Sequence, residues 1–239
     1  PQGYPILEKG QYAEIRQFTR ILGAAKVSGK TKKGWSIGIL ESVTANEQTE
    51  VKGAGFSNTQ SIEPLTNYFI SRIEKDFNEG NTYVGGMITS VNRNIKNDKL
   101  DFLHKSAYSG GLDFVHKWKD RKFEINLGSY FSHVAGTKEA ILKTQKSFTR
   151  TFQRPDATHL SIDTSLTSLT GYGGKLLFGS LYGDQKFMLT LSWKSPKLEL
   201  NDVGYIQKAD NISQGLWTGH YLYEPTALFR EAYINFNQW

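Results

Sequence analysis

Apolar and polar side chains alternate along most of this 239-residue chain. In residues 107–118 the large apolar side chains fall mainly on even positions, whereas Asp113 and Lys117 fall on odd ones. A charged turn follows near residues 119–122, and the alternation then resumes over residues 123–132. A period of two is typical of a strand with one apolar and one polar face, so this region predicts a β-hairpin.

The same alternation recurs along the chain and predicts about ten antiparallel strands. Weaker strands are expected near residues 65–77, 82–93 and 228–239. Tight turns are expected near residues 30–34, 78–81, 119–122, 183–186 and 224–228. The connections between hairpins are long and polar and lie near residues 45–63, 94–105, 134–168 and 199–211. The longest contains TKEAILKTQKSF, which predicts a short helix.

The lengths of the connections alternate between short and long. In a meander every second connection lies at the same end of the sheet, so one end is expected to carry the tight turns and the other the long loops. This asymmetry is typical of transmembrane β-barrels, whose strands need about 9–11 residues to cross. The sequence therefore predicts a single all-β domain from residue 1 to 239, an antiparallel meander that forms a transmembrane β-barrel.

Two sets of side chains are expected on opposite faces of this barrel. The charged set should line the interior and comprises Lys26, Lys30, Asp113, Lys117, Glu124, Lys175, Lys186 and Lys194. The apolar set should face lipid or form aromatic girdles near the strand ends, and it comprises Trp35, Tyr108, Leu112, Phe114, Trp118, Phe123, Ile125, Leu127, Tyr172, Phe187, Leu189, Leu191 and Trp193. The spacing of Trp217, Tyr221 and Tyr223 predicts a further apolar face.

Alternation alone does not tell which face is inside, so a soluble barrel or sandwich with apolar residues inward is the alternative. Glycines within the strands, as in SGG, GYGG and VGGM, favour the membrane barrel. Glycine in a strand interior weakens a small soluble core, whereas a large barrel between water and lipid tolerates it better.

Composition excludes several classes of function. The net charge is +6, but Lys and Arg are dispersed and not gathered in one stripe, so nucleic-acid binding is not expected. The sequence contains no run of about 18 apolar residues, so it predicts no membrane-spanning helix. The chain has no Cys, and its five His do not have the spacing of a metal-binding helix. We therefore predict no metal, cofactor or catalytic residue.

Two stretches carry a family resemblance: RILGAAKVSGKTKKGWSIGILESVT and SIEPLTNYFISRIEKDFNEGNTYVGGMITSVNRN. They are similar to the outer-membrane barrel of a large Gram-negative family, in which a signal peptide and a family-9-like carbohydrate-binding domain precede a barrel of undefined function. The resemblance implies a bacterial outer-membrane location, with the short turns periplasmic and the long loops extracellular. It also implies that this chain is a fragment of a larger barrel protein, and it establishes no catalytic residue.

The expected function is a pore, or a surface anchor and docking platform for carbohydrate or partner proteins. Its expected partners are outer-membrane lipid and, at the surface, other proteins or carbohydrate. The excess of Lys on the polar face favours anionic solutes if the interior is open. The alternative function is a membrane-embedded or soluble β-barrel hydrolase, although the sequence has no G-x-S-x-G motif.

The sequence allows two ways in which the edges of the barrel could be paired. Either the strand near residue 20 pairs with the strand near residue 235, or both edges need further strands, because an open edge in lipid leaves unpaired backbone groups. Trp239 is the aromatic residue expected at the end of a barrel, but Asn235 and Asn237 occupy alternate positions where apolar residues are usual. We therefore expect further strands.

Overall fold

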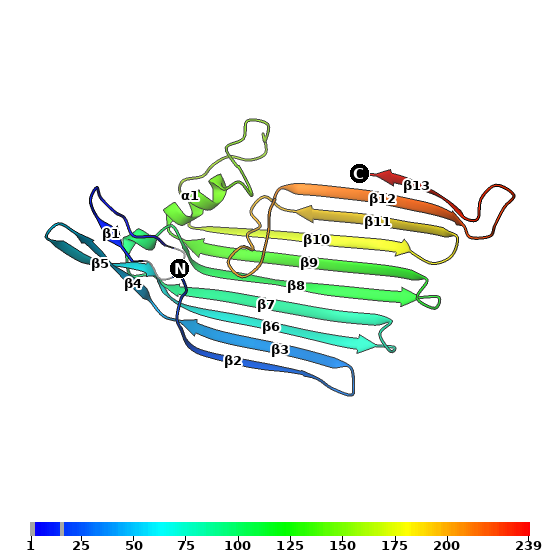
Figure 1. Cartoon of the computed structure of the whole chain (residues 1–239), viewed down its shortest axis with the longest axis horizontal. Helices are drawn as coiled ribbons and strands as arrows, with labels where there is room; N and C mark the ends of the chain where they lie inside the picture. Colours follow the sequence, from blue (N-terminus) through cyan, green and yellow to red (C-terminus); the bar gives the residue numbers. More distant parts are fainter. Residues whose placement is uncertain (1–2, 15–16) are drawn as a thin grey trace.

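The computed structural model describes residues 3–14 and 17–239, and its main feature is one sheet of ten antiparallel strands (Figure 1). These strands are β2 (Ile21–Lys30), β3 (Trp35–Thr44), β6 (Leu65–Phe77), β7 (Thr82–Asn94), β8 (His104–Trp118), β9 (Phe123–Gly136), β10 (Ser168–Ser180), β11 (Gln185–Lys194), β12 (Asn211–Leu222) and β13 (Ala232–Gln238). Each strand pairs with the one that precedes it in this order. The predicted all-β antiparallel meander is confirmed.

Four tight turns of four residues each lie together at one end of the sheet, as predicted (Figure 1). The tight turn expected near residues 224–228 is at the same end but is a longer connection of nine residues, 223–231, between β12 and β13. Backbone hydrogen bonds join turn residues to neighbouring strands: the N–H of Asp76 donates to the carbonyl of Gly34 at 2.8 Å, and that of Lys117 donates to Asn81 at 2.7 Å. The turn after β6 is possible because Gly80 adopts a φ of 86°, a left-handed conformation that favours glycine. The long connections consequently all lie at the opposite end, here called the loop end.

The sheet is open. Among the described residues, β2 is paired only with β3 and β13 only with β12, so no ladder joins the two edges. A closed ten-stranded barrel, the first of the two alternatives above, is therefore not what this chain forms in the structure.

The connection at residues 45–63 is not the polar loop that the sequence predicted. It forms β4 (Glu47–Gly53) and β5 (Phe56–Glu63), which pair with β1 (Tyr12–Ala13) in a second, three-stranded sheet at the loop end. Strand β4 buries every second side chain, but two of these, Glu47 and Thr49, are polar. The prediction failed because polar residues occupy the buried positions, so the alternation carries little hydrophobic contrast.

The other long connections contain short helices. The 3₁₀ helix η1 (Asp98–Leu100) lies between β7 and β8, and the helix α1 (Lys138–Lys146) lies between β9 and β10. The side chain of Thr137 caps α1 by accepting a hydrogen bond from the N–H of Ala140 at 3.1 Å. The predicted short helix is confirmed.

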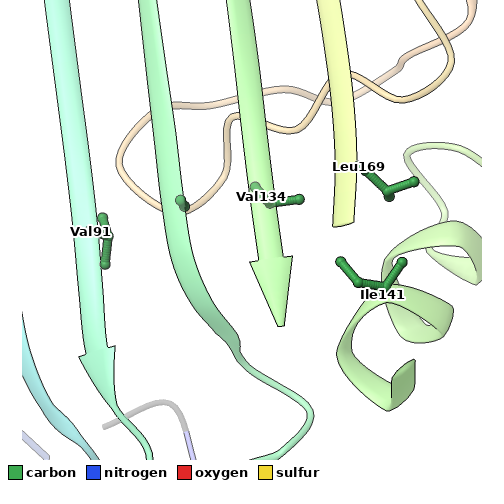
Figure 2. Packing of buried hydrophobic residues seen from close by; sticks show 5 residues of the cluster. Val91, Val134, Ile141 and Leu169 are labelled. Atoms are coloured by element: carbon green, nitrogen blue, oxygen red, sulfur yellow. The ribbon is translucent and has the colours of Figure 1, made fainter. Parts of the chain in front are cut away.

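The main buried cluster joins α1 to the sheet at the loop end. Ile141 of the helix is fully buried and packs with Val91, Ala107, Val134 and Leu169 from four successive strands (Figure 2). These strand residues share one face of the sheet, since Val91 pairs with Ala107, Ala107 with Val134 and Val134 with Leu169. The helix therefore covers one particular face of the sheet.

Candidate functional site

The strand register divides the ten-stranded sheet into two faces, because directly paired residues point to the same side. The face that carries Lys175 is called the polar face, and the face that carries Leu189 the apolar face. All residues of the charged set named above lie on the polar face, and all residues of the apolar set lie on the apolar face.

Charge is distributed very unequally between the two faces. Among the paired residues of the described sheet, the apolar face carries one carboxylate, that of Glu41, and one ammonium group, that of Lys75, together with the imidazoles of His116, His133 and His220. Glu41 accepts a hydrogen bond from the amide of Asn67 at 3.0 Å. The ammonium group of Lys75 lies over the rings of Trp35 and Phe77, 5.5 and 5.2 Å from their centroids. The rest of the paired apolar face carries no Asp, Glu, Lys or Arg.

The large side chains of the apolar face are exposed or partly exposed. Val27 is 67% exposed, Leu112 67% and Ile234 74%, so the exposed surface extends from one edge strand to the other. Towards the turn end, aromatic rings stack in a row, with centroid separations of 5.6 Å between Trp118 and Phe123 and 6.1 Å between Trp118 and Phe178. An exposed apolar surface of this extent is typical of a lipid or protein interface.

The polar face carries an ion-pair network at its centre. Arg72 of β6 binds Asp113 of β8 through two hydrogen bonds, at 2.9 and 3.0 Å, and also binds Glu74 at 2.9 Å. Such bidentate pairs are the strongest and most directional ionic contacts. In contrast, Lys26, Lys30, Lys175 and Lys194 have no hydrogen-bonding or ionic partner among the residues that the structure describes. The polar face therefore has unmatched positive charge.

The connection between β11 and β12, here called the 195–210 loop, folds over the polar face (Figure 1). Its residues Leu198, Ile206 and Ala209 form a second buried cluster, which packs against Tyr130 of the polar face. The N–H of Glu199 donates to the hydroxyl oxygen of Ser132 at 2.9 Å. The loop therefore contacts the polar face directly through both apolar and polar groups.

Three carboxylates fasten this loop. Glu199 pairs with the buried Arg150 at 2.8 Å. Asp202 pairs with Arg93 at 2.6 Å and Asp210 pairs with Arg154. Leaving one partner of a buried pair uncompensated typically costs 3–5 kcal/mol in proteins, about the scale expected here. The loop is consequently a fixed cover and not a free segment.

Asp202 is the most connected of the three carboxylates. Its Oδ2 lies 2.8 Å from Nδ1 of His104, whose Nε2 lies 2.8 Å from the hydroxyl of Thr144 in α1. Burial alone would raise the pKa of Asp202, but the hydrogen bonds and charges of His104 and Arg93 outweigh burial and hold this pKa below its usual value. Asp202 therefore joins the loop, the sheet and the helix as an anion.

A cavity of about 450 Å³ lies between the 195–210 loop and the polar face. Its polar lining includes Arg72, Asp113, Asn126, Tyr130 and Lys175. Leu200 and Val203 contribute apolar surface from the loop, and Met87 and Val115 contribute it from the sheet. The volume falls within the range of small-molecule sites in proteins.

Residues 4–239 match the model of a family described as domain of unknown function (DUF5916). The chain belongs to the DUF5916 family. No match was found in comparisons with the curated proteins and with the solved structures. The DUF5916 match covers the whole of the sheet and the loops described above, so both faces and the cavity belong to the family domain.

The structure corrects two sequence interpretations of this DUF5916 sheet. Trp217 and Tyr221 were expected on an apolar face, but they lie on the polar face, where Trp217 pairs with Met188 and Tyr221 stacks on Tyr223 and Tyr233. In β12 the aromatic residues lie on the polar face, whereas the apolar face mixes apolar and polar residues such as Leu216 and Thr218. The more hydrophobic side of this strand is therefore not the side that continues the apolar face of the sheet. Asn235 and Asn237 also lie on the polar face. Ile234 and Phe236 continue the apolar face, so the register accounts for both asparagines.

Sequence reasoning missed Arg93, His104, Arg150 and Asp202, which hold the loop. A signal was present, because the polar segment 195–210 contains Leu198, Leu200, Val203 and Ile206. Their partners lie far away in the sequence, so no local pattern identifies them.

The described ranges 3–14 and 17–239 hold neither a helix long and apolar enough to cross a bilayer nor a group of three His, Cys, Asp or Glu residues that could bind a metal ion. The chain of Asp202, His104 and Thr144 resembles an acid–base–nucleophile arrangement in its distances. However, the Thr144 hydroxyl also lies 2.9 Å from the carbonyl of Ala140 within α1, and its side chain is buried. This geometry suits a structural link better than a nucleophile.

Proposed function

We propose that the ten strands form part of the wall of a β-barrel in the bacterial outer membrane, and that small polar solutes pass along its polar face. The unequal charge of the two faces is the observation that carries this proposal. A lipid-facing strand surface must lack charge, because a basic side chain at the bilayer midplane costs about 2–4 kcal/mol. From β2 to β13 the apolar face carries no Asp, Glu, Lys or Arg apart from Glu41 and Lys75. Its three histidines, His116, His133 and His220, each form a hydrogen bond with an uncharged side chain of a neighbouring strand.

The position of the covering segments also supports a membrane location. In a soluble sheet, helices and loops cover the apolar face and leave the polar face in water. Here α1 and the 195–210 loop cover the polar face instead, and the large apolar side chains of the other face are exposed. This inverted arrangement is the one expected when lipid covers the apolar face.

The open edges fit a larger barrel. Unpaired N–H and C=O groups in lipid cost several kcal/mol each, so β2 and β13 need further strands as partners in a membrane. We propose that such strands complete the barrel, with the short turns in the periplasm and the loop end outside the cell. Strands on either side would continue the same alternation of apolar and polar residues.

A docking platform is the second candidate function. A groove of about 370 Å³ lies between β4, β5 and the segment that precedes η1. Its lining is rich in amides and hydroxyls, including Asn46, Gln48, Thr59 and Asn94. Such groups both donate and accept hydrogen bonds, which suits an uncharged polar partner such as carbohydrate. This groove lies at the loop end, outside the proposed membrane.

The hydrolase alternative rests on the chain of Asp202, His104 and Thr144 alone. Thr144→Ala should leave any ester hydrolysis by the purified protein unchanged if this chain is structural. Loss of a measurable esterase activity in that variant, with the fold intact, would favour the enzyme over the pore.

Reconstitution tests the proposed function. The complete barrel, in which further strands pair with β2 and β13, should aggregate in plain buffer, become monodisperse in detergent and float with lipid vesicles in a density gradient. A planar-bilayer recording should then show conductance if solutes pass, whereas a docking platform should insert without conductance. A protein that stays monodisperse in buffer and does not float would contradict the membrane location.

A further inference from the structure

We infer that the cavity beneath the 195–210 loop is a binding site for a small organic anion with a short apolar body. The inference deepens the proposed passage of solutes and rests on it only for its biological meaning, because the site itself is defined by residues of the folded chain. Four observations carry it: an unpaired cation, neighbouring charges that are already matched, a free amide and an apolar roof.

Lys175 provides the cation. It lines the cavity, and its ammonium group has no hydrogen-bonding or ionic partner among the described residues. A Cβ built at Gly128, its cross-strand neighbour on β9, would lie 2.9 Å from Cε of Lys175. The lysine side chain therefore lies flat across Gly128, along the sheet. Gly128 in turn pairs with Asp113 of β8. Lys175 therefore extends over β9, the strand that lies between β10 and β8.

The other two charged residues that line the cavity, Arg72 and Asp113, pair with each other. Asp113 gives both carboxylate oxygens to Arg72, which also binds Glu74. Asp113 lies across Gly85 in the same manner, since a Cβ there would be 2.5 Å from its Oδ2. Because the carboxylates are engaged by the guanidinium group, the charge of Lys175 stays available for a ligand. The three charged residues that line the cavity, Arg72, Asp113 and Lys175, carry a net charge of +1, which a bound anion would neutralise; Glu74 binds Arg72 from outside the lining.

The remaining lining specifies the rest of the ligand. The side chain of Asn126 has no hydrogen bond to another described residue and can donate to or accept from the ligand. Leu200 and Val203 form an apolar roof, and Met87 and Val115 an apolar floor. An anionic head beside Lys175 and Asn126, with a short hydrocarbon body between roof and floor, therefore matches the chemistry of the cavity.

A set of three probes of equal length tests the inference: hexanoate, the neutral hexanamide and the cation hexylammonium. Their binding to the full chain in detergent micelles is measured by titration calorimetry, with the protein-free micelle as the blank. Hexanoate should bind more tightly than the other two. Lys175→Met, which keeps an unbranched side chain that is one atom shorter, should weaken hexanoate binding about tenfold to a hundredfold, since a hydrogen bond to a charged group is lost.

Lys26→Met is the matched control. It removes the same charge from the same face, but Lys26 lies on β2 and not in the cavity lining. It should leave hexanoate binding within about twofold of the unmodified chain, since surface charges this far away are screened by salt. Equal thermal unfolding of both variants excludes a folding defect as the cause.

The inference fails if folded protein does not prefer hexanoate to hexanamide, or if Lys175→Met and Lys26→Met weaken binding equally. These outcomes differ from failure of the proposed function, which appears as absence of vesicle flotation or of conductance. A chain that floats and conducts without preferring the anion would leave the pore standing and overturn this site.

Discussion

An arginine placed on the apolar face should disrupt assembly far more than one placed one residue away. Leu189 lies in the middle of β11 on the apolar face, paired with Phe178 and Leu216, and it is 40% exposed. Leu189→Arg puts a charge near the bilayer midplane, which costs about 2–4 kcal/mol. This energy lowers the folded-to-unfolded ratio roughly 30- to 900-fold.

Met188→Arg is the matched control, because residue 188 lies on the polar face of the same strand, next to Leu189. The side chain that it replaces is unbranched and similar in length to that of leucine. It should change the free energy of unfolding by less than about 1 kcal/mol. Lys186→Glu should likewise leave assembly intact and alter only the charge of the polar face, although it removes a hydrogen bond to the hydroxyl of Tyr223. The assay is equilibrium unfolding by guanidinium of protein inserted in lipid vesicles. Equal losses at 188 and 189, or a larger loss at 188, would refute the sidedness.

Further predictions concern the loop on the polar face. Gly171→Ala should displace the 195–210 loop, because a Cβ at 171 would overlap the backbone of Leu198; faster hydrogen exchange of the loop amides checks this. Gly38→Ala, on the same face with nothing within 4 Å, should leave exchange unchanged, and similar exchange in both variants would contradict the contact. Because the pKa of Asp202 is lowered by folding, its stabilisation is fully present above the unfolded value of about 3.9 and is lost as pH falls through the lower folded value. The protection factors of the loop amides, in which the intrinsic pH dependence of exchange is divided out, should therefore stay high at pH 5 and fall only below about pH 4. A fall between about pH 7 and 5 would contradict this role.

The meander and its two faces could be predicted from the sequence because both follow from local alternation. A strand places successive side chains on opposite sides, so residues such as Asp113 and Phe114 separate without any knowledge of their neighbours. The tight turns could also be predicted locally, because glycine is the residue that best adopts the left-handed conformation they need, as at Gly80. The short helix after β9 was also local, since Thr137 caps it.

The loop end could not be predicted because its structure depends on distant partners. Strand β4 buries Glu47, which is satisfied by Arg20 at 2.9 Å, a contact that no local pattern reveals. The 195–210 loop binds residues more than 45 positions away, as in the pair of Glu199 and Arg150. The cavity exists only because these contacts hold the loop over the sheet.

The central claim is that one face of this sheet meets lipid and the other water. The chain has no Cys, so single cysteines can carry spin labels without interference. Leu191 and Ser192 are adjacent in β11 and lie on the apolar and the polar face, respectively. In vesicles, a label at 191 should collide mainly with oxygen, which concentrates in lipid, and a label at 192 mainly with a water-soluble nickel chelate. Equal accessibility of both labels to the nickel chelate would contradict the account.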